Sequence, residues 1–103
     1  MTHIVANRVP VAPGWEEAFE QRFRQRAAQV ESQPGFVRME ILRPLSEGAP
    51  YVVLTAWESA EAFRAWVGSE DFKEAHRNPL PKEAFTGEGR LEQHQVIISA
   101  DRC

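Results

Sequence analysis

The residues best suited to take part in chemistry are His76 and Trp66, which lie in the stretch EAFRAWVGSEDFKEAH, residues 61–76. A neutral imidazole is the usual axial ligand of heme iron, but a histidine at a helix end is also often an exposed residue that interacts with the helix dipole. On one continuous helix the two side chains would lie about 15 Å apart along the axis. The Gly68–Ser69 break allows the next short helix to fold back, so that both side chains could line one cavity. The spacing permits this convergence without requiring it, and Trp66 could instead be ordinary core.

Asn7 is a polar side chain in an otherwise apolar row that contains Val5, Val9 and Val11. A buried carboxamide without a partner costs about 1–3 kcal/mol, so Asn7 needs a hydrogen-bond partner if it is buried. Two interpretations are open: Asn7 bonds a nearby loop or lies near the strand end, or it donates into a pocket.

Two arginines of the first predicted helix, Arg22 and Arg26, are four residues apart and therefore share one face. Such a pair is usually solvated, and its functional interpretation is a clamp for carboxylates. The other histidines, His3 and His94, fall in strand patterns, and no HxxxH or Cys/His cluster accompanies them. A structural zinc site is therefore not expected.

The hydrophobic periodicity predicts the elements that must position these residues. Strands are predicted over residues 2–11, 36–43, 51–58 and 91–100, and helices over 15–32, 60–67 and 70–77. Ser59 and Ser69 stand at the N-cap positions of the last two helices. The order β-α-β-β-α-β predicts an α+β, ferredoxin-like fold with an antiparallel sheet, as one domain over residues 1–103. The connecting loop over residues 78–89 has a length that is often functional.

The third predicted strand is apolar on both faces: Val52, Leu54 and Ala56 alternate with Tyr51, Val53 and Trp57. A sheet with one face in water should alternate apolar and polar residues, and the helices of such a fold cover one face only. We therefore expect a second copy of the chain to cover the other face in a symmetric homodimer.

Composition excludes several classes of protein. The chain has 103 residues, 43% of them hydrophobic and 26% charged, with a net charge of -3. These values favour a soluble globular protein without the basic surface that nucleic acid requires. No apolar run approaches the length of a membrane span, and no signal peptide is evident at the start. The single cysteine, Cys103, allows no internal disulfide, which is compatible with a reducing cytoplasm.

The quoted motifs, taken together, resemble a known family. Asn7 in ANRV, RFRQR on the first helix, PGFVRMEIL, TAWES and AFRAWVGSEDFKEAH are similar to the heme-degrading monooxygenases of the IsdG type. These belong to the antibiotic-biosynthesis monooxygenase superfamily of dimeric ferredoxin-like α/β barrels. The resemblance runs from about residue 5 to residue 78. Within it, asparagine, tryptophan and histidine at positions 7, 66 and 76 are the features of the heme-degrading branch.

The resemblance implies an enzyme that binds heme and opens the porphyrin to release iron, with O2 and an external electron donor such as an unidentified reductase. Heme would be substrate and cofactor together. His76 would be the proximal ligand of the iron, Trp66 would press on the porphyrin and bend it, and Asn7 would hydrogen-bond toward oxygen at the iron. Arg22 and Arg26 would help to hold the propionates. Contacts from residues 79–95 are not implied, because the resemblance ends after AHRN.

Two alternatives remain open at this point. A cofactor-free monooxygenase of the same superfamily, acting on a quinol-like aromatic, would need no iron ligand. A heme binder or sensor without enzymatic activity would share the ligand but not the turnover.

Overall fold

A computed structural model describes residues 2–25 and 30–102 of the chain. Four strands form one antiparallel sheet in the order β2-β3-β1-β4. The strands are β1 (His3–Val9), β2 (Phe36–Leu42), β3 (Tyr51–Trp57) and β4 (Arg90–Gln95), and the helices are α1 (Glu16–Gln25), α2 (Ala60–Val67) and α3 (Glu70–Ala75). Two short 3-10 turns, η1 (Val30–Ser32) and η2 (Lys82–Ala84), complete the described elements.

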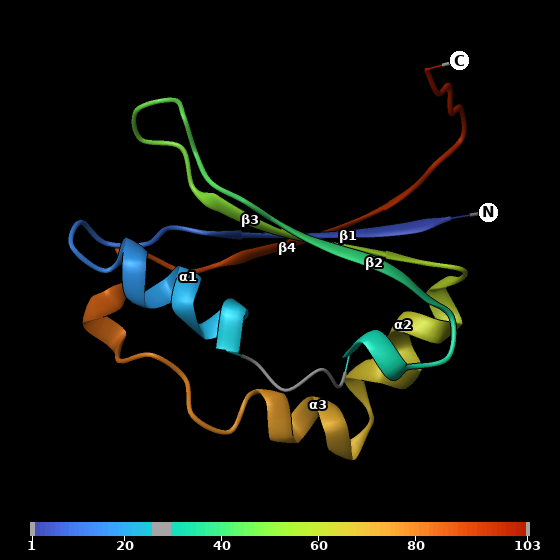
Figure 1. The fold of residues 1–103 in the computed structure, drawn as a ribbon, viewed down its shortest axis with the longest axis horizontal. Helices are drawn as coiled ribbons and strands as arrows, with labels where there is room; N and C mark the ends of the chain where they lie inside the picture. Colours follow the sequence, from blue (N-terminus) through green and yellow to red (C-terminus); the bar gives the residue numbers. More distant parts are fainter. Residues whose placement is uncertain (1, 26–29, 103) are drawn as a thin grey trace.

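The predicted ferredoxin-like arrangement is confirmed. The described helices lie on one side of the sheet, with α1 under one end of the strands and α2 and α3 under the other (Figure 1). None of the helices among the described residues is both long and apolar enough to cross a membrane.

The core lies between the sheet and α2. Val5 on β1, Trp57 on β3, Val30 on η1 and Trp66 on α2 form one buried cluster. Trp57 is completely buried, and its indole Nε1–H donates to the Thr55 hydroxyl at 2.9 Å. The register pairs His3 with Trp57 and Asn7 with Val53, so the odd-numbered side chains of β1 and β3 share the face that the helices cover.

Serine caps begin α2 and α3 where the sequence predicts them. The Ser59 hydroxyl accepts from the Ala62 N–H, and the Ser69 hydroxyl accepts from the Phe72 N–H, both at 3.1 Å. The bounds of α2 match the prediction residue for residue, and α3 ends two residues early, at Ala75. Gly68 forms the C-cap of α2, so the chain changes direction where the GS break predicts it.

The first helix and the last strand differ most from the prediction. The first helix is described over Glu16–Gln25, and residues 30–32, which were predicted to belong to it, form a 3-10 turn that brings Val30 into the core. Residues 26–29, which include Arg26, lie outside the described residues, as does Cys103. The last strand ends at Gln95, not at residue 100, because Gln95 pairs with His3, the first residue of β1.

The second face of the sheet carries the even-numbered residues of β3, which are Val52, Leu54 and Ala56, as predicted. Ile4 and Ala6 of β1 lie beside them in the register, and Arg8 and Leu42 lie at the edge of this apolar area. No helix in the described part of the chain covers this face (Figure 1).

Candidate functional site

His76 is the C-cap residue of α3, and its side chain is exposed. Its Nδ1 lies 2.8 Å from the backbone carbonyl oxygen of Phe72, one turn earlier. A carbonyl only accepts, so in the neutral imidazole the proton is on Nδ1 and the lone pair is on Nε2. The imidazole ring also packs on the Phe72 ring, with the two centroids 4.1 Å apart. The histidine is therefore fixed in orientation and tautomer, with Nε2 as its available ligand atom.

Trp66 reaches His76 through Phe72. The Trp66 and Phe72 rings meet edge to face, with centroids 5.4 Å apart, and Trp66 also stacks on Trp57 at 6.5 Å. Helix α3 thus folds back at the GS break, as the spacing permits, and a continuous row of rings joins the core to His76. Trp66 is 8% exposed, so most of its indole is core and only a small part of its surface faces outward.

Asn7 enters from the sheet. It is half-buried on β1, between Val53 of β3 and Leu91 of β4, on the face that carries the helices. A methyl group placed on Gly89 would lie 3.5 Å from the Asn7 Oδ1 atom, so the carboxamide lies against the backbone that leads into β4. The register pairs Asn7 directly with Leu91, so a polar and an apolar side chain lie next to each other on this face.

Arg22 connects α1 to the segment after His76. Its guanidinium donates a hydrogen bond to the backbone carbonyl of Asn78, and its side chain is exposed. Farther along this segment, the Ala12 N–H donates to the Ala84 carbonyl at 2.7 Å, and Val11 pairs with Phe85. The loop that follows His76 is therefore anchored on α1 at its start and on the end of β1 near its finish.

A cluster around Glu20 was not found from the sequence. The Glu20 carboxylate accepts hydrogen bonds from Arg43 at 2.8 and 2.6 Å, from the Tyr51 hydroxyl and from Arg24 at 3.2 Å. These partners, Arg43 first and then Tyr51, lower the pKa of Glu20 to about 2. Burial, together with the bond to Glu20, raises the pKa of Tyr51. The one sequence signal is a carboxylate at position 20, directly after the apolar residue Phe19.

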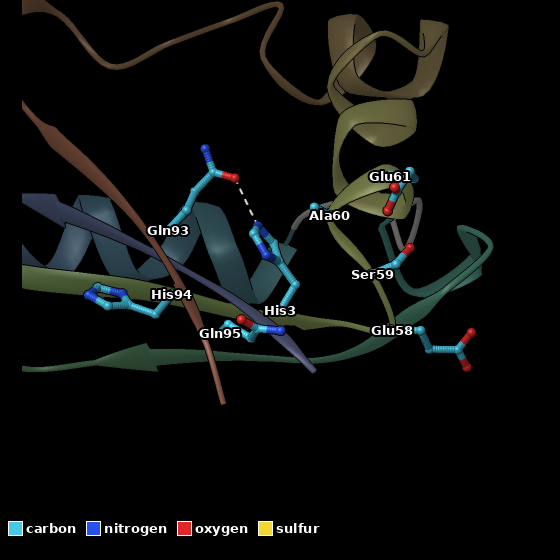
Figure 2. Close-up of a pocket in the computed structure, with 8 residues that line it drawn as sticks. All are labelled: His3, Glu58, Ser59, Ala60, Glu61, Gln93, His94 and Gln95. Carbon is cyan, nitrogen blue, oxygen red and sulfur yellow. Dashed lines mark hydrogen bonds between the residues drawn. The ribbon is translucent and has the colours of Figure 1, made fainter. Parts of the chain in front are cut away.

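Two cavities lie among the described residues, one of them beside the Glu20 cluster. One, of about 480 Å³, lies between α1 and the β2–β3 hairpin and is lined by the Glu20 cluster with Phe23, Met39 and Ile41. The other, of about 520 Å³, lies where β3 enters α2, beside the end of β4 (Figure 2). There His3 bonds Gln93 at 2.8 Å, and the register places His94 on the opposite face of the sheet. Asn7, Trp66 and His76 line neither cavity.

The structure therefore links Trp66 to His76 through Phe72 and bonds Arg22 to Asn78, two residues after His76. It places Asn7 on the sheet face that the helices cover. Among the described residues, no group of three or more His, Cys, Asp or Glu side chains could hold a metal ion. A metal bound at His76 would need its other ligands from a molecule such as a porphyrin.

Comparison with known proteins supports the same family. The mycobilin-producing heme oxygenase of Mycobacterium tuberculosis is 36% identical over 97 residues, which cover 94% of this chain and 91% of that protein. The structure of the heme-degrader MhuD from Mycobacterium tuberculosis with two hemes bound in its active site superposes with a TM-score of 0.80, at 33% identity, over 96% of this chain and 99% of that one.

A solved structure with a different chemistry is also similar. SnoaB from Streptomyces nogalater, a cofactor-independent oxygenase, superposes with a TM-score of 0.75 at 25% identity, over 98% of each chain. The family model described as antibiotic biosynthesis monooxygenase matches residues 2–78, about three quarters of the chain. This protein therefore belongs to the antibiotic biosynthesis monooxygenase family.

Proposed function

We propose that this protein is a heme-degrading monooxygenase that binds heme through His76 and opens the porphyrin ring to release iron. The observation that carries the proposal is the 2.8 Å contact between His76 Nδ1 and the Phe72 carbonyl oxygen, which leaves Nε2 for a ligand. Metal-binding histidines commonly donate their second ring N–H to a carbonyl in this way. The similarity to heme oxygenases over nearly the whole chain supports the same assignment.

Heme suits the residues that are present, because the porphyrin supplies four nitrogen ligands to the iron and the protein needs to supply only one more. His76 offers a single imidazole, and the described residues contain no metal-binding cluster that would compete with a porphyrin. When bound, heme supplies the reactivity toward O2, with electrons from an external donor. Because heme is also the substrate, each turnover consumes it.

The remaining site residues would orient the substrate. Asn7 would donate a hydrogen bond toward the bound heme from the sheet, whereas His76 would hold it from the end of a helix. Trp66 would press its exposed edge on the ring, since Trp57 and Phe72 hold its indole in place. Arg22 and Arg26 are the proposed partners of the propionate carboxylates.

We also propose that the working form is a cytoplasmic homodimer built on the open sheet face. Val52 and Leu54 lie on a face that no described helix covers, and Ile97 and Ile98 beyond β4 are 74% and 83% exposed. Burying apolar surface of this kind against a second copy is the expected driving force. Sedimentation at micromolar concentration should give about twice the chain mass of 11.7 kDa, and a clean monomer would refute the homodimer.

The alternative is a cofactor-free monooxygenase acting on a quinol-like aromatic, because a cofactor-independent oxygenase shares the fold at 25% identity. Such an enzyme would need no iron ligand, so the two functions differ in their need for His76.

Titration of the purified protein with hemin tests the proposal. We expect a saturable Soret shift for the parent, its loss in His76→Ala, and parental binding in His94→Ala, a matched exposed histidine on the other face of the sheet. Addition of a reductant in air should then bleach the Soret band and release iron. Absence of a specific Soret shift would favour the cofactor-free alternative, and binding without bleaching would leave a heme binder.

A further inference from the structure

Glu20 and Arg22 belong to one helix but make their contacts on opposite sides of it. Two residues along an α-helix correspond to a rotation of about 200°. Glu20 accepts hydrogen bonds from Arg43 and Tyr51 at the β2–β3 hairpin, whereas Arg22 donates to the backbone carbonyl of Asn78. Helix α1 is thus bonded to the sheet on one side and to the segment after His76 on the other.

The sheet side of α1 is held by a charged cluster whose central carboxylate is mostly covered by its partners. The Glu20 side chain is 13% exposed, and both of its oxygens accept from Arg43. Phe19, the preceding residue, packs on the Tyr51 ring with the centroids 4.9 Å apart. Charge-assisted, two-point hydrogen bonds of this kind fix geometry as well as adding energy. Glu20 therefore sets where α1 lies on the sheet.

The segment that carries His76 depends on contacts from outside its own helix. Helix α3 has six residues, and a helix of that length is marginal without tertiary support. The N–H of His76 bonds the Phe72 and Lys73 carbonyls, which ends the helical pattern. The next connection to the rest of the fold is the bond from Arg22 to Asn78, two residues after His76.

We propose that Glu20 is a positioning residue, which holds α1 on the sheet through Arg43 and Tyr51 so that Arg22 can hold Asn78 and the backbone around His76. This inference rests on the proposed function, in which His76 is the heme ligand. Glu20 acts through Arg22, so its effect should disappear when Arg22 is absent.

The heme-free protein provides the first test, independent of heme chemistry. Amide hydrogen exchange at His76 and Arg77, measured by NMR, should be about threefold to tenfold faster in Glu20→Gln, which corresponds to the loss of one hydrogen bond. Glu17→Gln changes an exposed carboxylate of the same helix and should leave exchange at the parental rate. If Glu20→Gln does not fold, Tyr51→Phe, which keeps the Arg43 ion pair, should shift exchange in the same direction by a smaller factor.

A double-mutant comparison with Arg22→Ala identifies the route. Exchange in the double variant Glu20→Gln/Arg22→Ala should be no faster than in Arg22→Ala alone, because both substitutions remove the same connection between α1 and Asn78. The positioning role would be overturned if the two substitutions speeded exchange independently, so that their factors multiplied in the double variant. It would also be overturned if Glu20→Gln lowered the melting temperature but left exchange at His76 at the parental rate.

Hemin titration gives the second readout. Glu20→Gln should weaken binding about threefold to tenfold and broaden the iron–histidine band in resonance Raman spectra, which a loss of global stability alone would not do. If Glu20→Gln exchanges faster but binds hemin with parental affinity and shows an unchanged iron–histidine band, Glu20 does not act on the heme site and the positioning role is overturned. If the parent itself binds no hemin, the proposed function fails, and the exchange data alone decide whether Glu20 positions this segment.

Discussion

Gly35, in the PGF turn before β2, should be far more sensitive to an added methyl group than its conformation alone would predict. Its φ is +79°, a conformation in which L residues with a side chain are strained. A Cβ at this position would lie 2.5 Å from the Ala62 Cβ on α2, the helix that carries Trp66. The Gly35 carbonyl also accepts from the Glu58 N–H at 2.8 Å, so the turn cannot simply move away.

The expected cost has two separable parts. The left-handed conformation costs about 1–2 kcal/mol for alanine, and forcing an extra methyl group into a filled space costs about 1–3 kcal/mol. Gly35→Ala should therefore lower the free energy of unfolding by roughly 2–5 kcal/mol. Gly48 has the same φ of +79°, but a methyl group added there would meet no described atom within 4 Å, so Gly48→Ala should cost only the first part.

Urea unfolding of the two variants measures the difference, provided that each unfolds in a two-state transition. The contact itself is tested by Ala62→Gly, which removes the opposing methyl group at a cost of about 1 kcal/mol for glycine in a helix. In the Ala62→Gly background, Gly35→Ala should cost no more than Gly48→Ala does. Equal costs for Gly35→Ala and Gly48→Ala in the parent protein, or no coupling with Ala62→Gly, would refute the close approach of the PGF turn and α2.

Three further predictions concern the site and its surroundings. Trp66→Ala should cost about 3–5 kcal/mol in urea unfolding because it empties a buried ring site, whereas Trp66→Phe should keep heme bound but flatter and degraded more slowly. Resonance Raman spectra and bleaching rates check the second variant, and parental values would confine Trp66 to packing. Asn7→Ala should bind hemin but degrade it poorly in a bleaching assay, and unchanged turnover would remove Asn7 from the site. The pKa of Glu20 is lowered from 4.5 to about 2, so its stabilising contribution is complete above pH 4.5 and is lost as the pH falls toward 2. The difference in urea midpoint between the parent and Glu20→Gln should therefore shrink over that interval, and a constant difference would contradict the assignment.

The candidate site could be predicted from the sequence only in part. Local signals were sufficient for the ends of α2 and for the turn that brings α3 back toward Trp66, because caps and breaks act within a few residues. The same signals placed His76 at a helix end and Asn7 on the face of β1 that carries Val5. The roles of these residues toward heme came from resemblance and stay predictions.

The Glu20 cluster shows why the rest was missed. Glu20, Arg43 and Tyr51 are brought together by the position of α1 on the hairpin, and no local pattern reports which charged residue of a helix will face a sheet. The bond from Arg22 to Asn78 likewise joins residues that are 56 positions apart. A carboxylate beside an apolar stripe could have suggested a buried partner, but it could not have named one.

The sequence by itself determined the order of elements, the helix breaks and which residues share a strand face, because these follow from periodicity and from hydrogen bonds between near neighbours. Only the tertiary structure decided where β4 stops and how Val30 reaches the core. Val30 lies in a 3-10 turn, and β4 ends at Gln95, which pairs with His3, the first residue of β1. The length of a strand depends on the strand beside it and the path of a helix on the surface that it covers, and both are properties of the folded chain.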